Sequence, residues 1–575
     1  MAGVPRTPWR ARPAAVLALL MAGCGVPAGE PAGPEGPTAP PAGADRTAPA
    51  GDGRLGAPAG AAARAADLAA ALADEDLVGQ VLMPYVFGDS ATEVAPPAAA
   101  ANREYAAVAA PAELVRRYRV GGVILLRRTD ATGAVTPSSN VSTPEQVRAF
   151  TADLGAAAAL PLLIGIDQEY GVVARLTEGV TGLPSAMASG AAADPALTEA
   201  AWRVAGTELA SLGVNVNFAP VADVLADLDG GVIGSRSYGS DPALTAAQVS
   251  AVVRGLQGTG VAATLKHFPG HGGTVVDSHT DLPVVGVSRE DLVAGDLPPF
   301  AEGIAAGAWL VMSGHLDVRG IDRGVPATFS RAVMTDLLRG ELGFDGVAVT
   351  DALNMAPARR WPAGEAAVRA LLAGNDLLLM PPDLAAAYDG LLAALRSGTL
   401  PRARLVEAVT RVLTLKLRLA DVEPPAASVV AGPTHQAAVA ALAAAAVTML
   451  RGSCAAAPVT GPVTVTAAAG RGQARRWLVA ALAAAGVEVS RSGGTLVHLV
   501  GFGDTAGDLR RDAGVTVAMD TPYLLARAGS PVLLATYSSS RLSMEALAAV
   551  LAGTLPPRGR SPVAVPGLPR SSCDA

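Results

Sequence analysis

Short apolar runs alternate with amphipathic stretches through the middle of the chain. The segments between the runs, such as 242–256 and 332–342, carry apolar residues at helical spacing, whereas the runs themselves are short and continuous, as in buried strands. The runs begin near Val81, Gly122, Leu162, Val214, Ala262, Trp309, Val347 and Asp376. Eight strand-then-helix units predict an α/β fold with a parallel sheet, closed as a (β/α)8 TIM-like barrel over 66–420.

A second, smaller α/β unit is predicted after the barrel. A Pro- and Ala-rich linker at 421–434 separates the two, and the second domain is expected over 435–575. Its strand-like runs are 463–467, 487–490, 496–500, 515–519 and 532–537, and its helical stretches are 474–485 and 543–552.

The first residues have the pattern of an export signal. Arg6, Arg10 and Arg12 precede an apolar run at 14–22 that is too short to span a bilayer permanently, so a signal peptide is expected over 1–23. The run ends in Leu-Met-Ala-Gly-Cys and resembles a bacterial lipobox, which predicts lipidation of Cys24. The protein is then an exported lipoprotein at the outer face of the cytoplasmic membrane; without lipidation it is secreted.

The residues that follow Cys24 are almost entirely Ala, Gly and Pro, with scattered charges. Such a composition cannot bury enough side chain to offset the entropy of ordering, so 24–65 is expected to be a disordered tether. After Cys24 only Cys454 and Cys573 remain, which excludes a disulfide framework and leaves a single bridge open. A net charge of −7 and a pI near 5.5 exclude a general nucleic-acid binder and favour a small or neutral partner.

Ionisable residues end four of the predicted strands. Asp167 ends the third, Lys266 and His267 the fifth, His315 the sixth and Asp351 the seventh. Active sites of such barrels lie at the carboxyl ends of the strands, so these side chains are expected to converge there.

The segment 266–279 is the densest chemical motif, with three of the six histidines and one of the two lysines. Asp351 is fixed by its strand and suits a nucleophile. His279 follows Asp277 by two residues, a spacing that orients the imidazole and stabilises its charged form. A histidine can donate a proton to a leaving group and then accept one from water. Together these groups predict double displacement through a covalent intermediate, which needs no cofactor and no metal.

At these residues the chain resembles glycoside hydrolase family 3, and within it the bacterial exo-acting β-N-acetylglucosaminidases that trim peptidoglycan fragments. The resemblance covers about residues 70–420 and lies in four motifs: 166–169 with Arg175, 233–238, 266–279 and 350–355. It implies that Asp351 is the nucleophile and that His279, paired with Asp277, is the acid/base. It also implies that a terminal N-acetylglucosamine is bound by Asp167, Arg175, Arg236, Lys266 and His267. The second domain is similar to the C-terminal α/β sandwich of two-domain members.

Two positions depart from the family pattern. Tyr170 stands where the family usually has Gly, and Val172 where it often has Arg, which leaves the aglycone preference open. An aromatic at 170 is predicted to stack on a sugar face or to narrow the second subsite. His271 is predicted to shape its loop, and His498 and Asp504 of the second domain are predicted to be structural.

Besides family members that cleave β-glucosides or β-xylosides, which generally lack the 266–279 block, three other functions remain open. The imidazole in place of a second carboxylate removes a like charge, so phosphate could approach the intermediate, and a phosphorylase is the nearest alternative. His267, His271 and His279 with Asp277 could instead bind a metal in a metal-dependent hydrolase. The third alternative is a non-catalytic sugar-binding surface protein. The sequence establishes neither the natural aglycone nor the oligomeric state.

Overall fold

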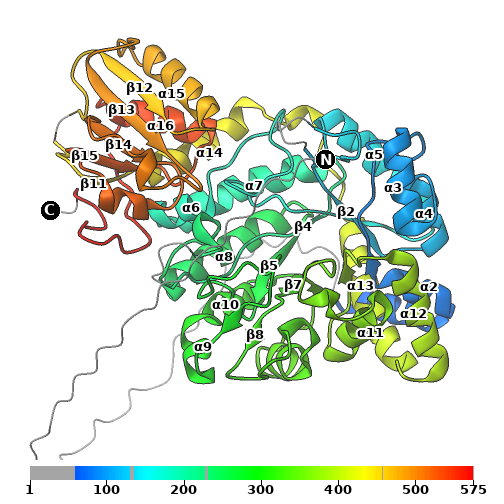
Figure 1. Ribbon diagram of the computed structural model, residues 1–575. Coiled ribbons are helices and arrows are strands. Elements are labelled where there is room, and N and C mark those ends of the chain that lie inside the picture. The colour runs from blue at the N-terminus through cyan, green and yellow to red at the C-terminus, as the bar shows by residue number, and fades with distance from the viewer. Residues whose placement is uncertain (1–57, 130–134, 227–230, 456, 574–575) are drawn as a thin grey trace, which may run out of the picture. The chain divides into compact units, whose positions relative to one another are not determined.

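The structure is a computed structural model that describes residues 58–129, 135–226, 231–455 and 457–573 (Figure 1). The predicted signal peptide and Cys24 lie outside these residues. Within the described ranges, no helix combines the length and the apolar character that crossing a bilayer requires.

The first domain is built on eight parallel strands, as the sequence predicts. Six form one sheet in the order β2-β3-β4-β5-β7-β9, and β1 pairs with β10. Parallel bridges from Tyr85 to Ile124 and from Val349 to Leu377 join this pair to both edges of the sheet, so the strands close as a TIM-like barrel. The strands are β1 (Leu82–Met83), β2 (Gly122–Leu125), β3 (Leu163–Ile166), β4 (Val216–Asn217), β5 (Ala262–Phe268), β7 (Leu310–Ser313), β9 (Val347–Thr350) and β10 (Leu378–Leu379). A separate parallel pair joins β6 (Val284–Val285) to β8 (Asp317–Val318).

Helices follow the strands around the barrel (Figure 1). Two of them, α7 and α8, begin with Asp-Pro: Asp194 and Asp241 accept hydrogen bonds from backbone N–H groups of the first turn, and the proline occupies the first helical position. The barrel helices are α2 (Asp74–Gln80), α3 (Pro96–Ala106), α4 (Pro111–Tyr118), α5 (Pro144–Ala157), α6 (Ala186–Ala192), α7 (Pro195–Ser211), α8 (Pro242–Gln257), α9 (Arg289–Gly295), α10 (Pro298–Ala305), η3 (Ala332–Glu341), α11 (Ala363–Ala373), α12 (Leu384–Ser397) and α13 (Arg402–Ala420).

The helix α1 (Pro58–Ala71) begins inside the segment that the sequence predicts to be a tether. It packs against α13, and its Ala65 and Ala69 are fully buried there. Alanine has the highest helix propensity, and small side chains allow close packing, so this stretch is ordered although its composition suggests otherwise. The prediction of disorder is therefore wrong for residues 58–65.

The second domain contains a five-stranded sheet in the order β11-β15-β14-β13-β12. Four strands are parallel and β11 is antiparallel at one edge. The strands are β11 (Thr448–Arg451), β12 (Val463–Ala467), β13 (Thr495–Val500), β14 (Val515–Ala518) and β15 (Val532–Ala535), and the helices are α14 (Pro433–Ala446), α15 (Gly472–Ala484) and α16 (Arg541–Leu551). The predicted strand at 487–490 is wrong, since only Val489 forms an isolated bridge there, to Val463.

Apolar side chains from both domains form one continuous core between them. Ser185 also donates to the backbone carbonyl of Tyr537 at 2.6 Å, and Ser235 donates to the buried carboxylate of Asp520. The barrel contributes Met187, Ala188, Ala191, Val221, Leu225 and Ile233 to this core, and the second domain contributes Leu450, Val500, Ala518, Leu533, Ala535, Tyr537 and Val563.

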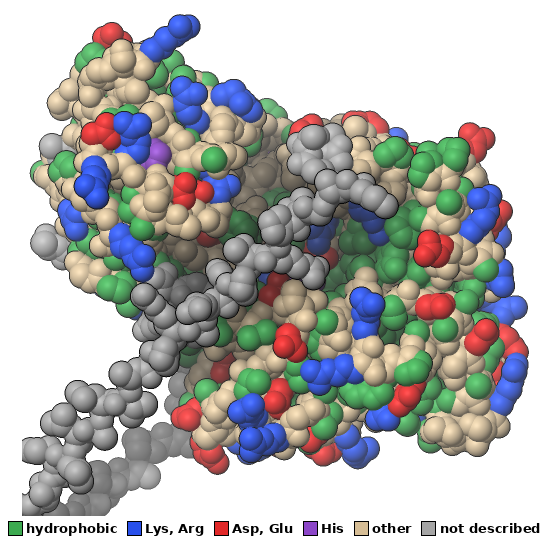
Figure 2. Space-filling view, in the orientation of Figure 1, with side chains coloured by type: hydrophobic (Ala, Val, Ile, Leu, Met, Phe, Trp, Pro, Cys, Tyr) green, Lys and Arg blue, Asp and Glu red, His purple; other side chains and the backbone are tan. Residues whose placement is uncertain are grey.

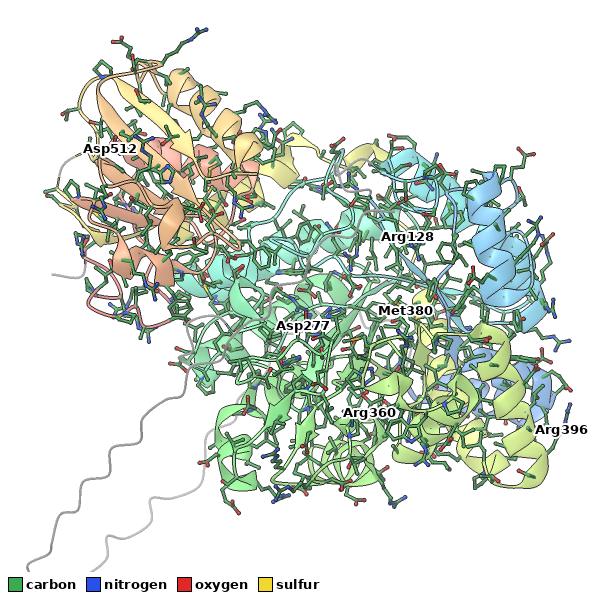
Figure 3. The ribbon with its side chains drawn as sticks, in the orientation of Figure 1. Arg128, Asp277, Arg360, Met380, Arg396 and Asp512 are labelled. Atoms are coloured by element: carbon green, nitrogen blue, oxygen red, sulfur yellow. A yellow bond between two sulfur atoms is a disulfide. The ribbon has the colours of Figure 1, made fainter. Side chains whose placement is uncertain are left out.

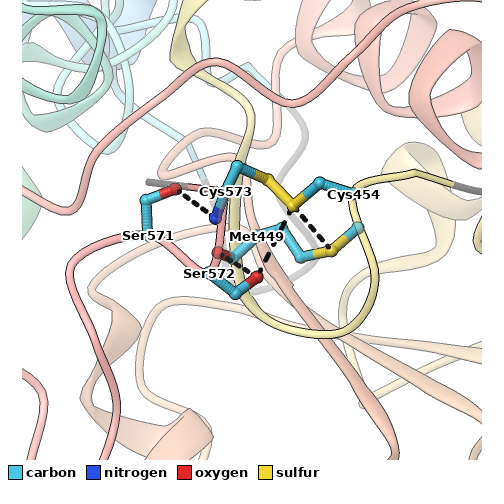
Figure 4. The surroundings of a disulfide bond; sticks show 5 residues. All are labelled: Met449, Cys454, Ser571, Ser572 and Cys573. Atoms are coloured by element: carbon cyan, nitrogen blue, oxygen red, sulfur yellow. Dashed lines mark hydrogen bonds between the residues drawn. A yellow bond between two sulfur atoms is a disulfide. The ribbon is translucent and has the colours of Figure 1, made fainter. Parts of the chain in front are cut away.

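The possibility of one late disulfide is realised (Figure 4). Cys454, after the edge strand β11, is bonded to Cys573, and the two Cα atoms are 5.6 Å apart. Ser572, next to this bond, donates its backbone N–H to the carbonyl of Met449 at 2.7 Å. The end of the described chain is thus attached to the edge of the second sheet.

Candidate active site

A cavity of about 670 Å³ lies at the carboxyl ends of the barrel strands. Its volume is typical of sites for small molecules. Every residue for which the sequence predicts catalysis or sugar binding lines it, and Figure 3 labels one of them, Asp277. These residues are Asp167, Arg175, Arg236, Lys266, His267, Asp277, His279 and Asp351.

Asp351 follows the last residue of β9 directly. Its backbone N–H donates to the carbonyl of Ser313 on β7 at 3.0 Å, which continues the strand pairing by one residue. Its carboxylate accepts the N–H of Ala352 at 2.7 Å. His315 is buried beside this turn, with Nε2 3.0 Å from the carbonyl of Ala352. The backbone that carries the carboxylate is therefore fixed on both sides.

The electrostatic surroundings favour the charged form of Asp351. Burial alone would raise its pKa, but the imidazoles of His267 and His315, the N–H of Ala352 and the ammonium of Lys266 together lower the pKa below its usual range. The carboxylate is thus ionised at neutral pH, as a nucleophile must be.

Lys266 and His267 are neighbours in β5, and both line the cavity. Successive side chains of a regular strand point to opposite faces. The pairing of β5 with β7 shifts register between Leu265 and Phe268, so the strand is irregular at these two positions. This irregularity explains how adjacent residues reach the same cavity.

Five charged side chains form a network at the inner end of the cavity, which we call the floor network: Asp167, Glu169, Arg175, Arg236 and Lys266. Lys266 Nζ lies 2.6 Å from Glu169 and 3.1 Å from Asp167. Arg236 binds both carboxylate oxygens of Glu169, at 2.7 and 2.9 Å, and Arg175 lies 3.3 Å from Asp167. Burial disfavours the ammonium of Lys266, but Glu169 and Asp167 hold its pKa above the usual value.

Glu169 belongs to a motif that the sequence identifies, yet its role is visible only in the structure. Burial would raise its pKa, but Arg236 and Lys266 outweigh burial and hold the pKa of Glu169 far below the usual range. Both cations come from distant parts of the chain. No local sequence signal reveals this pairing.

A second buried carboxylate supports the histidines. Asp223 is fully buried, and its carboxylate accepts from the N–H groups of His267 and His271 at 3.1 and 2.8 Å. Its other oxygen lies 2.8 Å from Nδ1 of His267, which fixes the ring. Sequence reasoning missed Asp223 because it lies six residues beyond the very short β4. His271 bonds to Thr274 and Ser278 through its ring, in agreement with a loop-shaping role.

His279 and Asp277 lie at the outer edge of the cavity. Nδ1 of His279 is 2.7 Å from Asp277, and the same carboxylate accepts the N–H of His279 at 2.9 Å. The side chains are 72% and 49% exposed, respectively. Slight burial would raise the pKa of Asp277, but the hydrogen bonds from His279 lower it. The structure therefore contains the pair predicted from the spacing, and the pair lines the same cavity as Asp351.

Tyr170 does not line this cavity, whereas Gly171, Val172 and Val173 do. Its ring is buried and lies edge-on to Trp202, with centroids 5.7 Å apart. The prediction that Tyr170 stacks on a sugar bound beside Asp351 is therefore wrong. Val172 is exposed at the outer edge, where the family often has Arg.

The histidines predicted as alternative metal ligands have other partners. Nδ1 faces Asp223 in His267, Thr274 in His271 and Asp277 in His279. Among the residues that the structure describes, no three His, Cys, Asp or Glu side chains are grouped as metal ligands.

The second domain also lines the cavity, through Arg471, Gly501, Phe502, Met519 and Ser539. None of these residues is predicted from the sequence. Asp504 binds Arg471 by an ion pair at 3.2 Å, and His498 is buried between Thr466 and the carbonyl of Asp508. Asp504 and His498 thus have structural contacts, as expected, but Asp504 also supports a wall of the cavity. On the face shown in Figure 2, acidic and basic side chains are interspersed.

The floor network predicts acid sensitivity. A carboxylate whose pKa is lowered by folding stabilises the protein above its unfolded pKa, about 4.3 for Glu, and this stabilisation is lost as the pH falls below that value. We expect thermal melts to show a steep loss of stability below about pH 4.3. Glu169→Gln should lower the free energy of unfolding by about 3–5 kcal/mol at neutral pH, because it leaves buried cations without their partner. The stability of this variant should also depend less on pH than that of the wild type.

Glu365→Gln serves as the matched control. Glu365 forms an exposed ion pair with Arg369 at 2.7 Å, so its loss should change stability by less than about 1 kcal/mol. An acid profile of Glu169→Gln as steep as that of the wild type would show that Glu169 is not the group responsible.

Known proteins match this chain over most of its length. The model of the glycosyl hydrolase family 3 N-terminal domain matches residues 75–415. A beta-hexosaminidase of Stenotrophomonas maltophilia (strain K279a) is 39% identical over 301 residues, which are 51% of this chain and 84% of that protein. Beta-hexosaminidase A of Pseudoalteromonas piscicida is 36% identical over 375 residues, 59% of this chain, and the match spans only 60% of that relative.

The comparison with solved structures extends over both domains. The structure of a glycoside hydrolase family 3 beta-N-acetylglucosaminidase from Paenibacillus sp. str. FPU-7 is similar, with a TM-score of 0.74 and 33% identity. The similarity covers 86% of this chain and 99% of that one, so the C-terminal domain is part of the shared architecture.

Proposed function

The chain belongs to glycosyl hydrolase family 3, and on this premise we propose that it is a retaining, exo-acting β-N-acetylhexosaminidase that removes terminal β-linked N-acetylglucosamine. One observation carries the proposal: Asp351 and the His279–Asp277 pair line a single cavity, together with the residues proposed to bind the sugar. The beta-hexosaminidase relatives support the same substrate class.

In the first step of the proposed reaction, a carboxylate oxygen of Asp351 attacks the anomeric carbon. The bond to the leaving oxygen breaks as His279 donates a proton to that oxygen, and a covalent glycosyl ester forms. In the second step His279 accepts a proton from water, the water oxygen attacks the anomeric carbon, and the ester bond breaks. Asp277 acts by orienting His279 through the hydrogen bond to Nδ1.

The floor network suits the recognition of one pyranose. Asp167 accepts from sugar hydroxyls, while Lys266, His267, Arg175 and Arg236 donate to the hydroxyl and N-acetyl oxygens. Because the side chains of the floor network already bind one another, and Asp223 fixes the ring of His267, all are positioned before the sugar arrives, which lowers the cost of ordering them. These contacts would bind only the terminal sugar of the substrate.

We further propose that the natural substrates are peptidoglycan fragments met outside the cytoplasm. The lipobox-like Leu20–Cys24 segment supports export and anchoring through Cys24. The disulfide between Cys454 and Cys573 supports an oxidising compartment, because such bonds rarely persist in a reducing cytosol.

The decisive assay compares an aryl β-N-acetylglucosaminide with the aryl β-glucoside, each with and without phosphate. We expect at least tenfold preference for the N-acetyl sugar, which corresponds to about 1.4 kcal/mol of transition-state binding. The expected product is the free sugar. A chelator should leave the activity intact, and inactivation by the chelator would favour a metal-dependent hydrolase.

Two other results would change the conclusion. Accumulation of the sugar 1-phosphate would favour the phosphorylase. Absence of turnover on both glycosides would favour a non-catalytic sugar-binding protein.

A further inference from the structure

The cavity wall formed by the second domain has no part in the chemistry proposed above. Gly501 and Phe502 follow β13, Met519 follows β14, and Ser539 lies beyond the end of β15. These are the carboxyl ends of parallel strands, where open α/β sheets place their ligands. The second sheet therefore presents its ligand-binding edge to the cavity that also receives the carboxyl ends of the barrel strands.

Phe502 is the distinctive residue of this wall. Its side chain is 61% exposed, and among the Phe, Tyr and Trp residues that the structure describes it is the one with an exposed side chain. A single exposed apolar side chain needs no explanation on an open surface. This one, however, lines the same cavity as Asp351 and His279.

The turn that carries Phe502 is held in place before any ligand binds. Asp504 accepts the N–H of Gly501 at 2.6 Å and two hydrogen bonds from Arg471, both at 3.2 Å. Arg471 also donates to the carbonyl of Phe502. A platform fixed in this way loses little conformational entropy when a ligand contacts it.

The charge of this wall is balanced. Arg471 is the cation that lines the cavity here, and its guanidinium is paired with the carboxylate of Asp504. The wall therefore offers an apolar face rather than a free charge. This combination suits stacking on a sugar ring, which carries C–H groups on one face.

The positions of the residues along the cavity, from its buried inner end to its exposed outer edge, indicate which sugar of the substrate contacts Phe502. Lys266 and His267 are buried at the inner end, where the terminal sugar is proposed to bind. His279, which would protonate the leaving oxygen, is exposed at the outer edge, and so is Phe502. The outer edge is therefore the leaving-group side.

Resting on the proposed function, we propose that Phe502 is the stacking platform for the aglycone sugar. The side chain acts on binding and orientation of the leaving group. It takes no part in proton transfer or in the attack on the anomeric carbon.

The test measures kcat/KM for two substrates, N,N′-diacetylchitobiose and β-N-acetylglucosaminyl fluoride. Both place the same sugar at the inner end, but fluoride is too small to reach a stacking platform. Phe502→Leu should lower kcat/KM for the disaccharide about 3- to 10-fold, the range expected for loss of one ring contact, and leave that for the fluoride within about twofold. Phe502→Tyr, which keeps an aromatic ring, should retain the wild-type kcat/KM for the disaccharide. Val293→Ala, at another exposed apolar position outside the cavity lining, is the matched control and should change neither value.

Several outcomes would overturn this inference. Equal losses on both substrates in Phe502→Leu would assign Phe502 to general stability, and equal retention would remove it from the site. If Phe502→Tyr lowers kcat/KM for the disaccharide as much as Phe502→Leu does, ring stacking is excluded. If the wild type cleaves the fluoride but not the disaccharide, the inference fails and the hydrolase function stands; if it cleaves neither, the proposed function itself fails.

Discussion

Asp351→Asn is expected to lower kcat/KM for aryl β-N-acetylglucosaminide by ~10³-fold or more. The amide keeps the size of the side chain and can still accept the N–H of Ala352, but it cannot form a glycosyl ester at a useful rate. The loss should be equally severe for good and poor leaving groups, because both need the nucleophile. Steady-state rates with a series of aryl leaving groups measure this.

Thermal melting and sugar binding serve as controls that Asp351→Asn still folds. Asp351 has no ion pair among the described contacts, so Asp351→Asn should melt within a few degrees of the wild type and still bind N-acetylglucosamine. Retention of more than about a tenth of the activity by a folded variant would show that Asp351 is not the nucleophile.

His279→Ala is expected to discriminate between leaving groups. For a disaccharide, whose leaving oxygen needs a proton, the rate should fall by about 10²- to 10⁴-fold. For a 2,4-dinitrophenyl glycoside the first step should be nearly unaffected, since this leaving group departs without a proton. The second step still lacks its base, so the covalent intermediate should accumulate and a burst of dinitrophenolate should precede a slow steady state. Stopped-flow absorbance records both phases.

Asp277→Asn separates the role of the carboxylate from that of the imidazole. It leaves His279 in place but removes the negative charge 2.7 Å from Nδ1. The value of kcat for a disaccharide should fall by at least about tenfold, because the carboxylate that orients the imidazole for proton transfer is lost. Asp281→Asn, in the same loop and 3.9 Å from Arg360, should leave kcat unchanged. Equal losses with both leaving groups in His279→Ala would remove the assigned acid/base role.

The barrel was predictable because its strands are short, continuous apolar runs separated by capped helices. The second domain was less so. The strand β11 follows the Ala-rich helix α14 almost without a break, so no turn residues mark its start. At 487–490 the pattern of a strand is present, but only Val489 finds a partner, through one bridge.

The residues of the site also fall into those that local sequence predicts and those that depend on contacts between distant segments. Asp167, Lys266 and Asp351 end strands, and strand ends converge wherever the barrel closes. Glu169 depends on Arg236, 67 residues away, and Asp223 on contacts with residues of the fifth strand and its loop. Phe502 reaches the cavity only through the packing of one domain on the other, which no local pattern encodes.

The apolar core that both domains share has a consequence for heat inactivation. Met187 and Ile233 of the barrel pack in the same cluster as Tyr537 and Val563 of the second domain, so neither half can melt without exposing the other's interior to water. The described chain is thereby coupled into a single cooperative unit, in which calorimetric melting and the disappearance of catalysis should coincide at one temperature.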